Sequence, residues 1–550
     1  MASNKTPNLN MDVWAEMDFF KRAELNSNFD KIDNAVKGNI DNIGLLQDAT
    51  GVGVNRYAKG DGSDETTKVQ NALSFGAGRL IIFPYGMSFK VNTITIPDNT
   101  TVFGYGSKIY NTSTQQTVLN VGSGVKIYGL EIQGVGNSSY VENGRGIGIT
   151  GSYNSSLGVV NYKTDVYLKD CYIHDFGGHG VFAEYAKNIR IDNCKIENVG
   201  YSGVMGISVT NMHVLNRTHI KGISPGNVYS YGVIFTRRAD TNSLTQYPRS
   251  KDCSVINCTV EDNPNWEGID THGGDNTLFS NNTVRNCKIG IVAVPSQLAT
   301  VDDCAPINPK ISNNTVYGIG SGVGITVSGA MSATNGSPTE FCDNPTIQGN
   351  TLINCGIIDD QFGGAIIVKG TRNASISGNT LKNSYVFGIN VYHTNTGFTV
   401  QGNTIQDTRA TTYTAPSGIA VRADFNYGTI SGNSILKVGT GLTETYVSKR
   451  GIFINTSTNV DVEIGTNYNT FEIPVRFASQ NFVANAKKYY STSIPISGSY
   501  TKGDYVENTN PSELGSAGSK YILNGWKRMT TGSTHVLNAD WFESRMLTGN

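Results

Sequence analysis

The feature that most constrains the fold of this chain is a short repeat that restarts many times along it. The stretch from Asn263 to Ile291 holds one full unit: an alternating run after Gly268, a glycine-rich turn, a second short run and a new start at Gly290, 22 residues later. A repeat of this length is typical of a solenoid, because one unit is too small to bury its own apolar face and must stack on its neighbours. Similar restarts, a glycine followed by an apolar residue, stand at Gly180, Gly203, Gly232, Gly268, Gly290, Gly324, Gly364, Gly388, Gly418 and Gly451.

A second marker recurs between the restarts. It is an asparagine followed by Thr or Ser and an aliphatic residue, and it begins at Asn282, Asn314, Asn350, Asn379, Asn403 and Asn433. Period-2 alternation with β-branched residues, broken by Gly and Asn turns, predicts short strands rather than helices. Stacked coils would place parallel strands about 4.8 Å apart. We expect the recurring asparagine to occupy one turn of each coil and form a ladder, because Asn tolerates the left-handed region and bonds nearby backbone.

The pattern resembles the right-handed parallel β-helix of the pectate-lyase-like superfamily. A second match is the segment from Tyr57 to Gln70, which looks like the motif with which that superfamily opens its solenoid. The motif implies a short helix over one end of the solenoid, and Asp64 can cap a helix that begins near Glu65. The expected fold class is all-β, a single-stranded right-handed parallel β-helix with a short helical N-terminus and a small C-terminal β module. This fold carries lyases, hydrolases, epimerases and adhesins, so it does not fix the reaction.

Composition excludes several classes of protein. The formal net charge is -1, so no basic field recruits nucleic acid. The chain has no run of 18 apolar residues, so we expect no membrane span. Its N-terminus lacks the layout of a secretory signal, which predicts that the usual secretion route is not used. The eight cysteines form no CxxC pair, and Cys171 and Cys194 occupy matching positions in successive units. We expect buried thiols rather than disulfides, and no metal or cofactor.

Three regions follow from these patterns. Residues 1–54 form a helical segment, 55–484 the β-helix and 485–550 a small β module. In the first region a heptad seam is formed by Leu25, Phe29, Ile32, Val36, Ile43 and Leu46. Such a seam predicts a short coiled coil between subunits. The alternative is an amphipathic helix that lies on its own β-helix.

Together these regions resemble a bacteriophage tailspike or tail appendage. The resemblance implies a homotrimer that is part of the virion tail and is attached through its N-terminus to tail or baseplate proteins. It also implies a ligand at the host cell surface, either a bacterial surface glycan or a teichoic acid.

Candidate chemistry gathers around the restart at Gly268. If the residue after each restart glycine faces the core, the second and fourth residues face outward, as Asp270 and His272 do here. Arg237 and Arg238 lie one coil earlier, and we expect them close to Asp270. The expected catalytic residues are Glu267, Asp270, His272 and Asp275. The expected substrate-binding residues are Glu184, Arg237, Arg238, Trp266, Asp302 and Asp303.

The same residues have structural interpretations. Asp275 follows Gly273-Gly274 and can be part of a turn, and Arg237 can be a structural counter-ion of Asp270. Because outward side chains are not part of the core, we expect Asp270→Asn to melt near wild type. Lys369 and His393 lie several coils further on and are expected to contact a long polymer without joining the chemistry.

Two function classes remain. One is an enzyme that depolymerises a surface glycan or teichoic acid. Hydrolysis would use the carboxylates as acid and base, whereas a lyase or phosphodiesterase would use the arginines to neutralise charge. The other is a receptor-binding or structural spike without catalysis.

Overall fold

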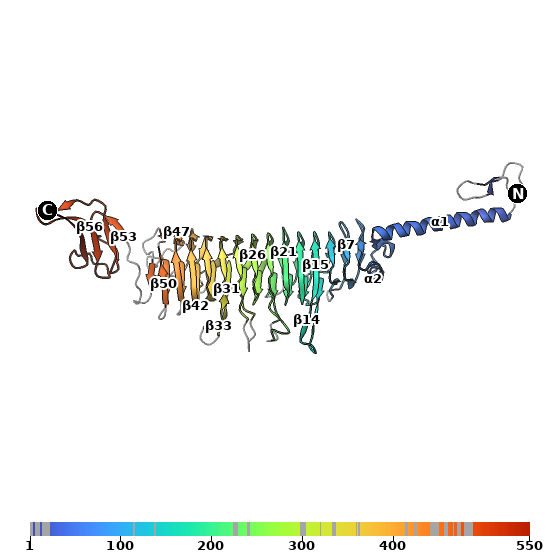
Figure 1. Ribbon diagram of the computed structural model, residues 1–550, viewed down its shortest axis with the longest axis horizontal. Coiled ribbons are helices and arrows are strands. Elements are labelled where there is room, and N and C mark those ends of the chain that lie inside the picture. Colours follow the sequence, from blue (N-terminus) through green and yellow to red (C-terminus); the bar gives the residue numbers. More distant parts are fainter. Residues whose placement is uncertain are drawn as a thin grey trace.

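The computed structural model describes residues 4–5, 12–13, 22–113, 116–136, 139–223, 229–238, 243–296, 304–319, 321–332, 337–358, 360, 363–412, 416–422, 426–440, 450–455, 460–465, 467–469, 475–477 and 488–549. A 41-stranded sheet winds from β3 (Val52–Gly53) to β52 (Val475–Phe477), and its strands pair in parallel from coil to coil. Figure 1 shows the coils stacked in one long row. The expected parallel solenoid is confirmed.

Each coil contributes strands to three faces. The face that contains the restart glycines, called the restart face below, comprises β6 (Ile94–Ile96), β9 (Leu119–Val121), β12 (Arg145–Thr150), β17 (His179–Glu184), β20 (Ser202–Ile207), β23 (Tyr231–Thr236), β25 (Thr259–His272), β27 (Thr283–Val294), β31 (Ile325–Ser328), β38 (Ile366–Arg372), β42 (Phe387–Gln401), β45 (Ser417–Arg422), β49 (Arg450–Asn455) and β52.

The second face follows it along the chain. It comprises the second half of β42 together with β3, β4 (Leu80–Ile82), β7 (Thr101–Phe103), β10 (Lys126–Tyr128), β15 (Lys163–Lys169), β18 (Ala186–Asp192), β21 (Thr210–Leu215), β24 (Ser254–Ile256), β26 (Leu278–Ser280), β28 (Lys310–Ser312), β34 (Cys342–Asp343), β35 (Thr346–Gln348), β39 (Ser375–Ser377), β46 (Asn426–Ser431) and β50 (Val460–Ile464).

The third face closes the coil. It comprises the first halves of β25 and β27 together with β5 (Ser88–Lys90), β8 (Lys108–Tyr110), β11 (Glu131–Gln133), β16 (Tyr172–Phe176), β19 (Lys195–Val199), β22 (His219–Ile223), β29 (Thr315–Tyr317), β36 (Thr351–Ile353), β40 (Thr380–Lys382), β43 (Thr404–Ile405), β47 (Ser434–Ile435) and β51 (Tyr468–Asn469).

One continuous core runs inside the three faces. On the restart face, the residue after each restart glycine points inward and is buried, as Val181, Val204, Val233, Ile269 and Ile291 are. The eight cysteines are free, buried thiols, as expected. The inward direction of the residues after the restart glycines follows from the strand period of two, which sends every second side chain into the core.

The asparagine ladder is present, but its geometry differs from the expected one. The side-chain amide of Asn314 donates to the Oδ1 of Asn350 at 2.9 Å, and Asn350 donates to Asn379 at the same distance. These side chains are buried, and their φ angles are not positive. The left-handed residue is the one before, for example Asn313 or Gly349. The ladder asparagine therefore satisfies buried backbone, while its neighbour makes the turn.

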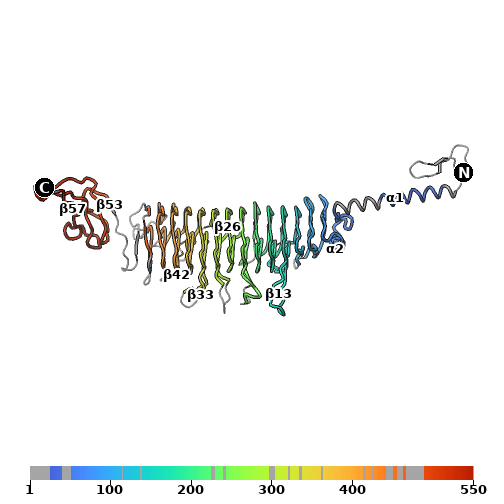
Figure 2. Tube along the Cα trace, viewed as in Figure 1, coloured from blue at the N-terminus to red at the C-terminus, as the bar shows by residue number. Residues whose placement is uncertain are grey.

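Two helices and two short strands belong to the N-terminal part. The strands β1 (Asn4–Lys5) and β2 (Asp12–Val13) pair antiparallel, and a 3-10 turn spans Val54–Arg56. The helix α2 (Thr66–Phe75) begins one residue later than expected, and its first amide donates to Oδ1 of Asp64 at 2.9 Å. The helix α1 (Arg22–Thr50) extends away from the first coils in Figures 1 and 2.

Three residues of the apolar seam of α1 are exposed within one chain, and the side chains of Ile43 and Leu46 lie outside the described residues. Phe29 is 59% exposed, and Ile32 and Val36 are exposed as well. This contradicts the alternative in which these three residues pack on the chain's own β-helix, because they would then be shielded. No helix in the described part of the chain is long and apolar enough to cross a membrane.

A separate five-stranded sheet lies at the C-terminal end: β53 (Lys488–Ser491), β54 (Tyr505–Asn508), β55 (Glu513–Leu514), β56 (Lys520–Arg528) and β57 (Trp541–Gly549). Its small core contains Val506, Trp526 and Trp541, with Tyr500 packed against it. These aromatic residues stabilise the module instead of forming an exposed sugar platform.

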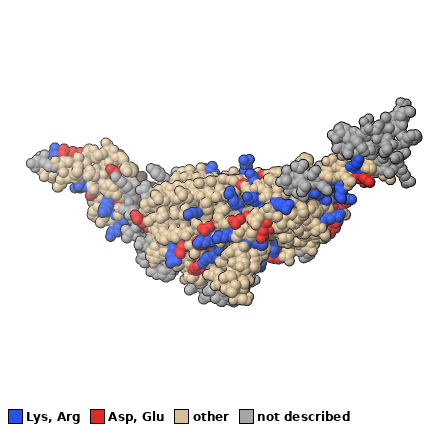
Figure 3. Space-filling model, turned by 45° about the vertical axis from the view of Figure 1, so that its right-hand side comes forward, with Lys and Arg blue, Asp and Glu red and all other residues tan. Residues whose placement is uncertain are grey.

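Insertions leave the solenoid as small side pieces. Hairpins form between β13 (Ser152–Asn154) and β14 (Val159–Asn161) and between β32 (Ala330–Met331) and β33 (Pro338–Glu340), and both project to the same side in Figure 1. The remaining pairings form two small sheets. One joins β30 (Ser321–Gly322) to β37 (Gly356–Ile357), and the other places β44 (Thr408–Arg409) between β41 (Ser384–Tyr385) and β48 (Val438–Thr440). Acidic and basic side chains are interspersed on the surface seen in Figure 3, in keeping with the small net charge.

Candidate functional site

Three titratable side chains meet on the restart strand β25. One donor atom each of Glu267, Asp270 and His272 lies within 4.8 Å of the other two. The Nε2 atom of His272 is 3.0 Å from Oδ2 of Asp270 and 3.6 Å from Oε2 of Glu267. We call these three residues the carboxyl–histidine cluster.

The backbone explains why they converge. Asp270 and His272 are two residues apart on one strand, so their side chains leave the same side of the sheet. Glu267 joins them because the pairing of β25 with β27 shifts in register between Asn263 and Glu267. The buried amide of Asn263 holds this irregular segment, since it donates to the carbonyl oxygens of Glu267 at 2.7 Å and Ser230 at 2.9 Å.

The three side chains differ in burial. The Asp270 side chain is 0% exposed, that of Glu267 is 5% exposed and that of His272 is 25% exposed. Burial, followed by the negative charge of Glu267, raises the pKa of Asp270 well above its usual value. The Asp270 carboxyl group, deep in the cluster, therefore favours its protonated form more than an exposed carboxyl group does, and His272 connects the cluster to the surface.

This burial corrects one expectation. Asp270 does point outward, but it is fully buried between its register partners Ile234 and Val292, and the outward side chains of the preceding coils are large. They form an apolar cluster, separate from the solenoid core, that comprises Phe182, Met205, Ile207, Tyr231 and Ile234, with Tyr201 and Trp266 packed against it. The premise that Asp270 is a dispensable surface side chain is therefore wrong.

An aromatic wall adjoins the cluster, and sequence reasoning did not find it. Tyr231 is the register partner of Glu267 on the preceding coil, and its ring lies 5.9 Å from that of His272. Tyr201 lies 5.5 Å from Tyr231, and His179 is 5.5 Å from Tyr201. The available signal was the residue before each restart glycine, because His179, Ser202, Tyr231 and Glu267 form one column across the coils; Tyr201 lies one residue before this column.

The far end of this column carries the positive charge of Arg145, which is balanced by Glu142. Arg145 is the register partner of His179, lies 3.5 Å from the centre of the Phe182 ring and pairs with Glu142 at 3.1 Å. Burial, followed by the charges of Arg145 and Arg238, lowers the pKa of His179 to about 3. His179 is thus neutral, and its Nδ1 lies 2.7 Å from the Ser202 hydroxyl.

The two expected arginines are engaged away from Asp270. Arg238 donates from Nε and Nη2 to the two carboxylate oxygens of Glu184, and the contact from Nη2 is 3.0 Å. Arg237 is buried, and its Nε donates to the carbonyl oxygen of Tyr247 at 3.1 Å. Strand spacing alone predicted that both arginines lie close to Asp270. Their side chains are long enough to bind a residue two coils away, as Arg238 does, or a loop, as Arg237 does.

Of the other expected site residues, one lies beside the cluster, one lies in the adjoining turn and two are not described. Asp275 lies beyond the turn at Gly273, and its carboxylate is 3.4 Å from Lys251. Trp266 is half-buried, with Lys288 5.1 Å from its ring centre and Tyr229 at 5.0 Å. Asp302 and Asp303 lie outside the described residues. Trp266 thus stays with the cluster, whereas Asp275 belongs to the adjoining turn.

The cluster also contains donors suited to a metal ion. One imidazole and two carboxylates form a donor set that divalent transition metals accept. Both carboxylate oxygens of Asp270 lack a hydrogen-bond donor among the described residues, apart from the contact to His272. A chelation experiment therefore belongs to the test of this site.

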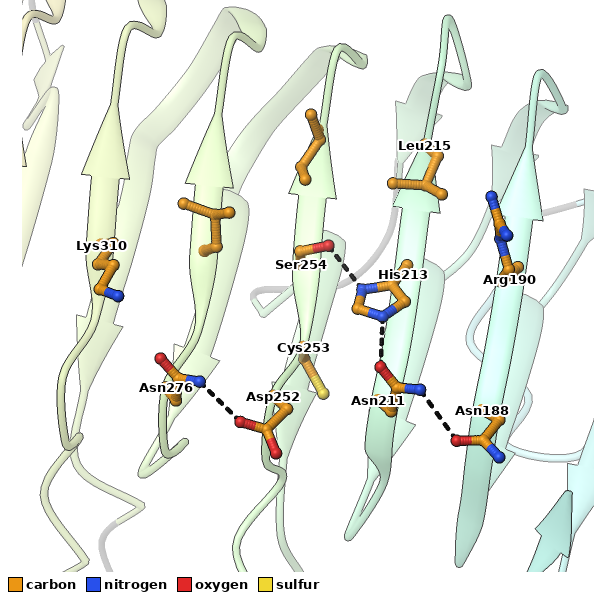
Figure 4. A pocket seen from close by; sticks show the side chains of 12 residues that line it. Asn188, Arg190, Asn211, His213, Leu215, Asp252, Cys253, Ser254, Asn276 and Lys310 are labelled. Atoms are coloured by element: carbon orange, nitrogen blue, oxygen red, sulfur yellow. Dashed lines mark hydrogen bonds between the residues drawn. The ribbon is translucent and has the colours of Figure 1, made fainter. Parts of the chain in front are cut away.

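A groove of about 660 Å³ lies elsewhere, on the second face. Figure 4 shows one register column along it, in which the small Ser254 stands between longer side chains such as His213 and Lys310. The Nδ1 atom of His213 is 2.7 Å from the Ser254 hydroxyl, and Asp252 accepts from Asn276 at 2.7 Å. Its lining contains one carboxylate, that of Asp252, and none of the cluster residues. The restart face, which holds two carboxyl groups and an imidazole, is therefore the better candidate for acid–base catalysis.

Comparisons with known proteins agree with the fold. Residues 157–337 and 247–405 match the family model of the right handed beta helix region. A capsule K30/K69-specific depolymerase of Klebsiella phage K64-1 is 26% identical over 164 residues, which cover 27% of this chain and 21% of that protein. The chain thus matches about a fifth of the length of that curated relative.

Solved structures with a similar fold are distant in sequence. An N-terminal fragment of bacteriophage Phi29 gene product 12 is 16% identical, with 84% of this chain and 77% of that chain covered and a TM-score of 0.48. The Dettilon tailspike protein is 15% identical, with 88% and 79% covered and a TM-score of 0.42. The catalytic unit of a GH87 alpha-1,3-glucanase from Streptomyces thermodiastaticus is 15% identical, with 77% and 69% covered and a TM-score of 0.46.

Proposed function

We propose that this chain is a bacteriophage tailspike that binds a bacterial surface polysaccharide and hydrolyses it at the carboxyl–histidine cluster. It would act at the host cell surface as part of the virion tail. The observation that carries the proposal is the meeting of Glu267, Asp270 and His272 within 4.8 Å on one face of a β-helix. The capsule specificity named for the phage relative supports a polysaccharide as the substrate.

The cluster supplies the two things that glycoside hydrolysis needs, a proton and a carboxylate. Burial beside Glu267 favours the protonated form of Asp270. Glu267 supplies the carboxylate, and the more exposed His272 lies within 3.0 Å of Asp270 and adjoins solvent. Each residue thus has a separate role: Asp270 holds the proton, His272 passes it outward and Glu267 stabilises positive charge.

Bonds and protons balance in the proposed hydrolysis. A proton passes from the cluster to the glycosidic oxygen, and the bond between that oxygen and the anomeric carbon breaks. Glu267 stabilises the developing positive charge on the sugar ring. Water then adds its hydroxyl group to the anomeric carbon and returns one proton to the cluster. The half-buried Trp266 and the Tyr231 ring supply apolar surface on which a sugar ring can stack.

Hydrolysis is favoured over the other two reactions by the position of the arginines. A lyase needs a cation to neutralise the uronate carboxylate, and a phosphodiesterase needs cations on the phosphate. Arg238 is bound to Glu184, and Arg237 donates to the Tyr247 carbonyl. Neither contact leads to Asp270.

The exposed seam residues of α1 support the remaining part of the proposal. Three copies of the helix would bury Phe29, Ile32 and Val36 against one another in a homotrimer. The N-terminal segment would then join the trimer to tail or baseplate proteins.

The test is product analysis with a panel of purified capsular polysaccharides. We expect one polymer to lose molecular mass on a sizing column, with new reducing ends and without the ultraviolet absorbance of an unsaturated uronate. Glu267→Gln should lower the cleavage rate by about 10²- to 10⁴-fold. Glu261→Gln is the matched control, because Glu261 stands on the same strand but pairs with His219 at 2.9 Å on the third face.

Three other results would change the proposal. An unsaturated product would make the enzyme a lyase. Loss of cleavage in a chelator, with recovery on added divalent metal, would assign the cluster a metal. Tight binding of a polymer without cleavage would favour the receptor-binding spike.

A further inference from the structure

The restart face continues beyond the cluster, and the position of His272 recurs on the following coils. His272 on β25 is the register partner of Val294 on β27. The register of β27 on β31 continues the column to Ser328, which pairs with Lys369 on β38. Lys369 in turn pairs with Tyr392 on β42. Lys369 therefore lies on the same column three coils further on, about 14 Å away at about 4.8 Å per coil. A linear polymer bound along this face would reach both places.

Lys369 is half-buried and has no counter-charge among the residues that the structure describes. In the part of the chain that the structure describes, its ammonium group has neither an ion pair nor a hydrogen bond. Burial lowers the pKa of Lys369, and no acidic group in the described ranges opposes that shift. An unpaired ammonium group is unfavourable in a poorly hydrated place, so an arriving anion gains more there than at an exposed lysine.

The surroundings add positive charge and an aromatic surface. The rings of Tyr392 and His393 lie 3.9 Å apart, and the Arg422 guanidinium is 5.3 Å from the centre of the Tyr392 ring. Burial, followed by the charges of Lys369 and Arg422, lowers the pKa of His393, so these nitrogen groups are close enough to repel one another. An anion would relieve that repulsion, and the Tyr392 ring suits the apolar face of a sugar.

We propose that Lys369 and its neighbours Tyr392 and His393 form an anion subsite of the polymer-binding face, which holds a carboxylate or phosphate group of the polymer about three coils from the cleaved bond. The inference rests on the proposed function for the identity of the ligand, and it adds that the polymer is acidic. Lys369 binds and positions in this scheme and takes no part in bond cleavage.

A labelling experiment tests the subsite without any turnover. The full-length protein is treated with an amine-reactive reagent at mildly alkaline pH, and labelling of each lysine is followed by mass spectrometry. Lys369 should be modified at a measurable rate, and inorganic phosphate should slow it several-fold. Lys382, on the third face, is the internal control and should be unaffected. If phosphate slows neither lysine, or if Lys369 is unreactive because another subunit already occupies it, the proposal is overturned.

A second experiment uses the polymer that the wild type cleaves. Lys369→Met should raise KM about tenfold or more with kcat little changed, because one charge-assisted contact is lost. Lys369→Arg should restore much of the affinity, and Lys382→Met should behave as wild type. Carboxyl reduction of the polymer should abolish the difference if the anion is a uronate, and removal of phosphate should do so if it is a phosphate ester.

The two proposals fail in different ways. Equal KM values for wild type and Lys369→Met on the native polymer would overturn the subsite while leaving the enzyme intact. Phosphate protection of Lys369 in a protein that cleaves none of the polymers would overturn the enzyme and leave the subsite.

Discussion

The Nε2 atom of His272 lies 3.0 Å from Oδ2 of Asp270, and the Asp270 side chain is fully buried behind it. The contact joins a surface imidazole to a carboxyl group that cannot reach water. Since Glu267 is the third member of the cluster, a proton on any one of these groups changes the energy of the other two.

The first prediction concerns the pH dependence of stability. Burial raises the pKa of Asp270, so above about pH 4, where an unfolded carboxyl group ionises, the folded protein still holds a proton that the unfolded chain releases. Wild-type stability should therefore fall as pH rises from that point through the raised pKa. Asp270→Asn has no such proton, so its melting temperature relative to wild type should increase with pH. A pH series of thermal melts measures this, and a constant difference would contradict it.

The second prediction separates the carboxylates. Glu267→Gln should lower kcat by about 10²- to 10⁴-fold, the usual size of an acid–base contribution, in a protein that is still folded. Asp275→Asn should keep most of the activity, because that carboxylate contacts Lys251 beyond the turn. Polymer cleavage rates give both values. Equal losses in the two variants would place Asp275 back in the site.

A third prediction addresses assembly. Ile32→Asp with Val36→Asp should break the trimer, because two exposed apolar seam positions would become charged. Light scattering should give three times the chain mass of 59.2 kDa for wild type and a single chain mass for the variant. Asp33→Ala with Lys37→Ala, on the outer positions of the heptads, is the control. A wild-type monomer at micromolar concentration would end the coiled-coil hypothesis.

The fourth prediction concerns the asparagine ladder. Asn350→Ala removes the acceptor of the Asn314 amide and the donors to Ile311 and Asn379, all of them buried. Each orphaned group costs about 1–3 kcal/mol. We expect a clear drop in the denaturant midpoint, with faster hydrogen exchange in the neighbouring coils. Gln348→Ala, an exposed position on β35, should change little, and equal effects would show that the ladder adds no stability of its own.

The repeat by itself determined the solenoid. Glycine restarts and recurring Asn-Thr pairs are local in sequence, and the strand period of two decides which residues face the core, so Ile269 could be assigned without a structure. The same period placed Asp270 and His272 on one side of the strand. The α2 helix was equally predictable, because its first amide is bonded by a residue two positions earlier.

Tertiary structure alone decided the rest of the site. Whether an outward side chain is exposed depends on what the neighbouring coils place beside it, and Phe182, Met205 and Ile234 are separated from Asp270 by insertions of variable length. Arg238 found Glu184 two coils away rather than Asp270, because a long flexible side chain can span more than one strand spacing. Repeat periodicity fixes the backbone and the direction of each side chain, whereas burial, charge pairing and therefore pKa depend on contacts between coils that no local pattern records.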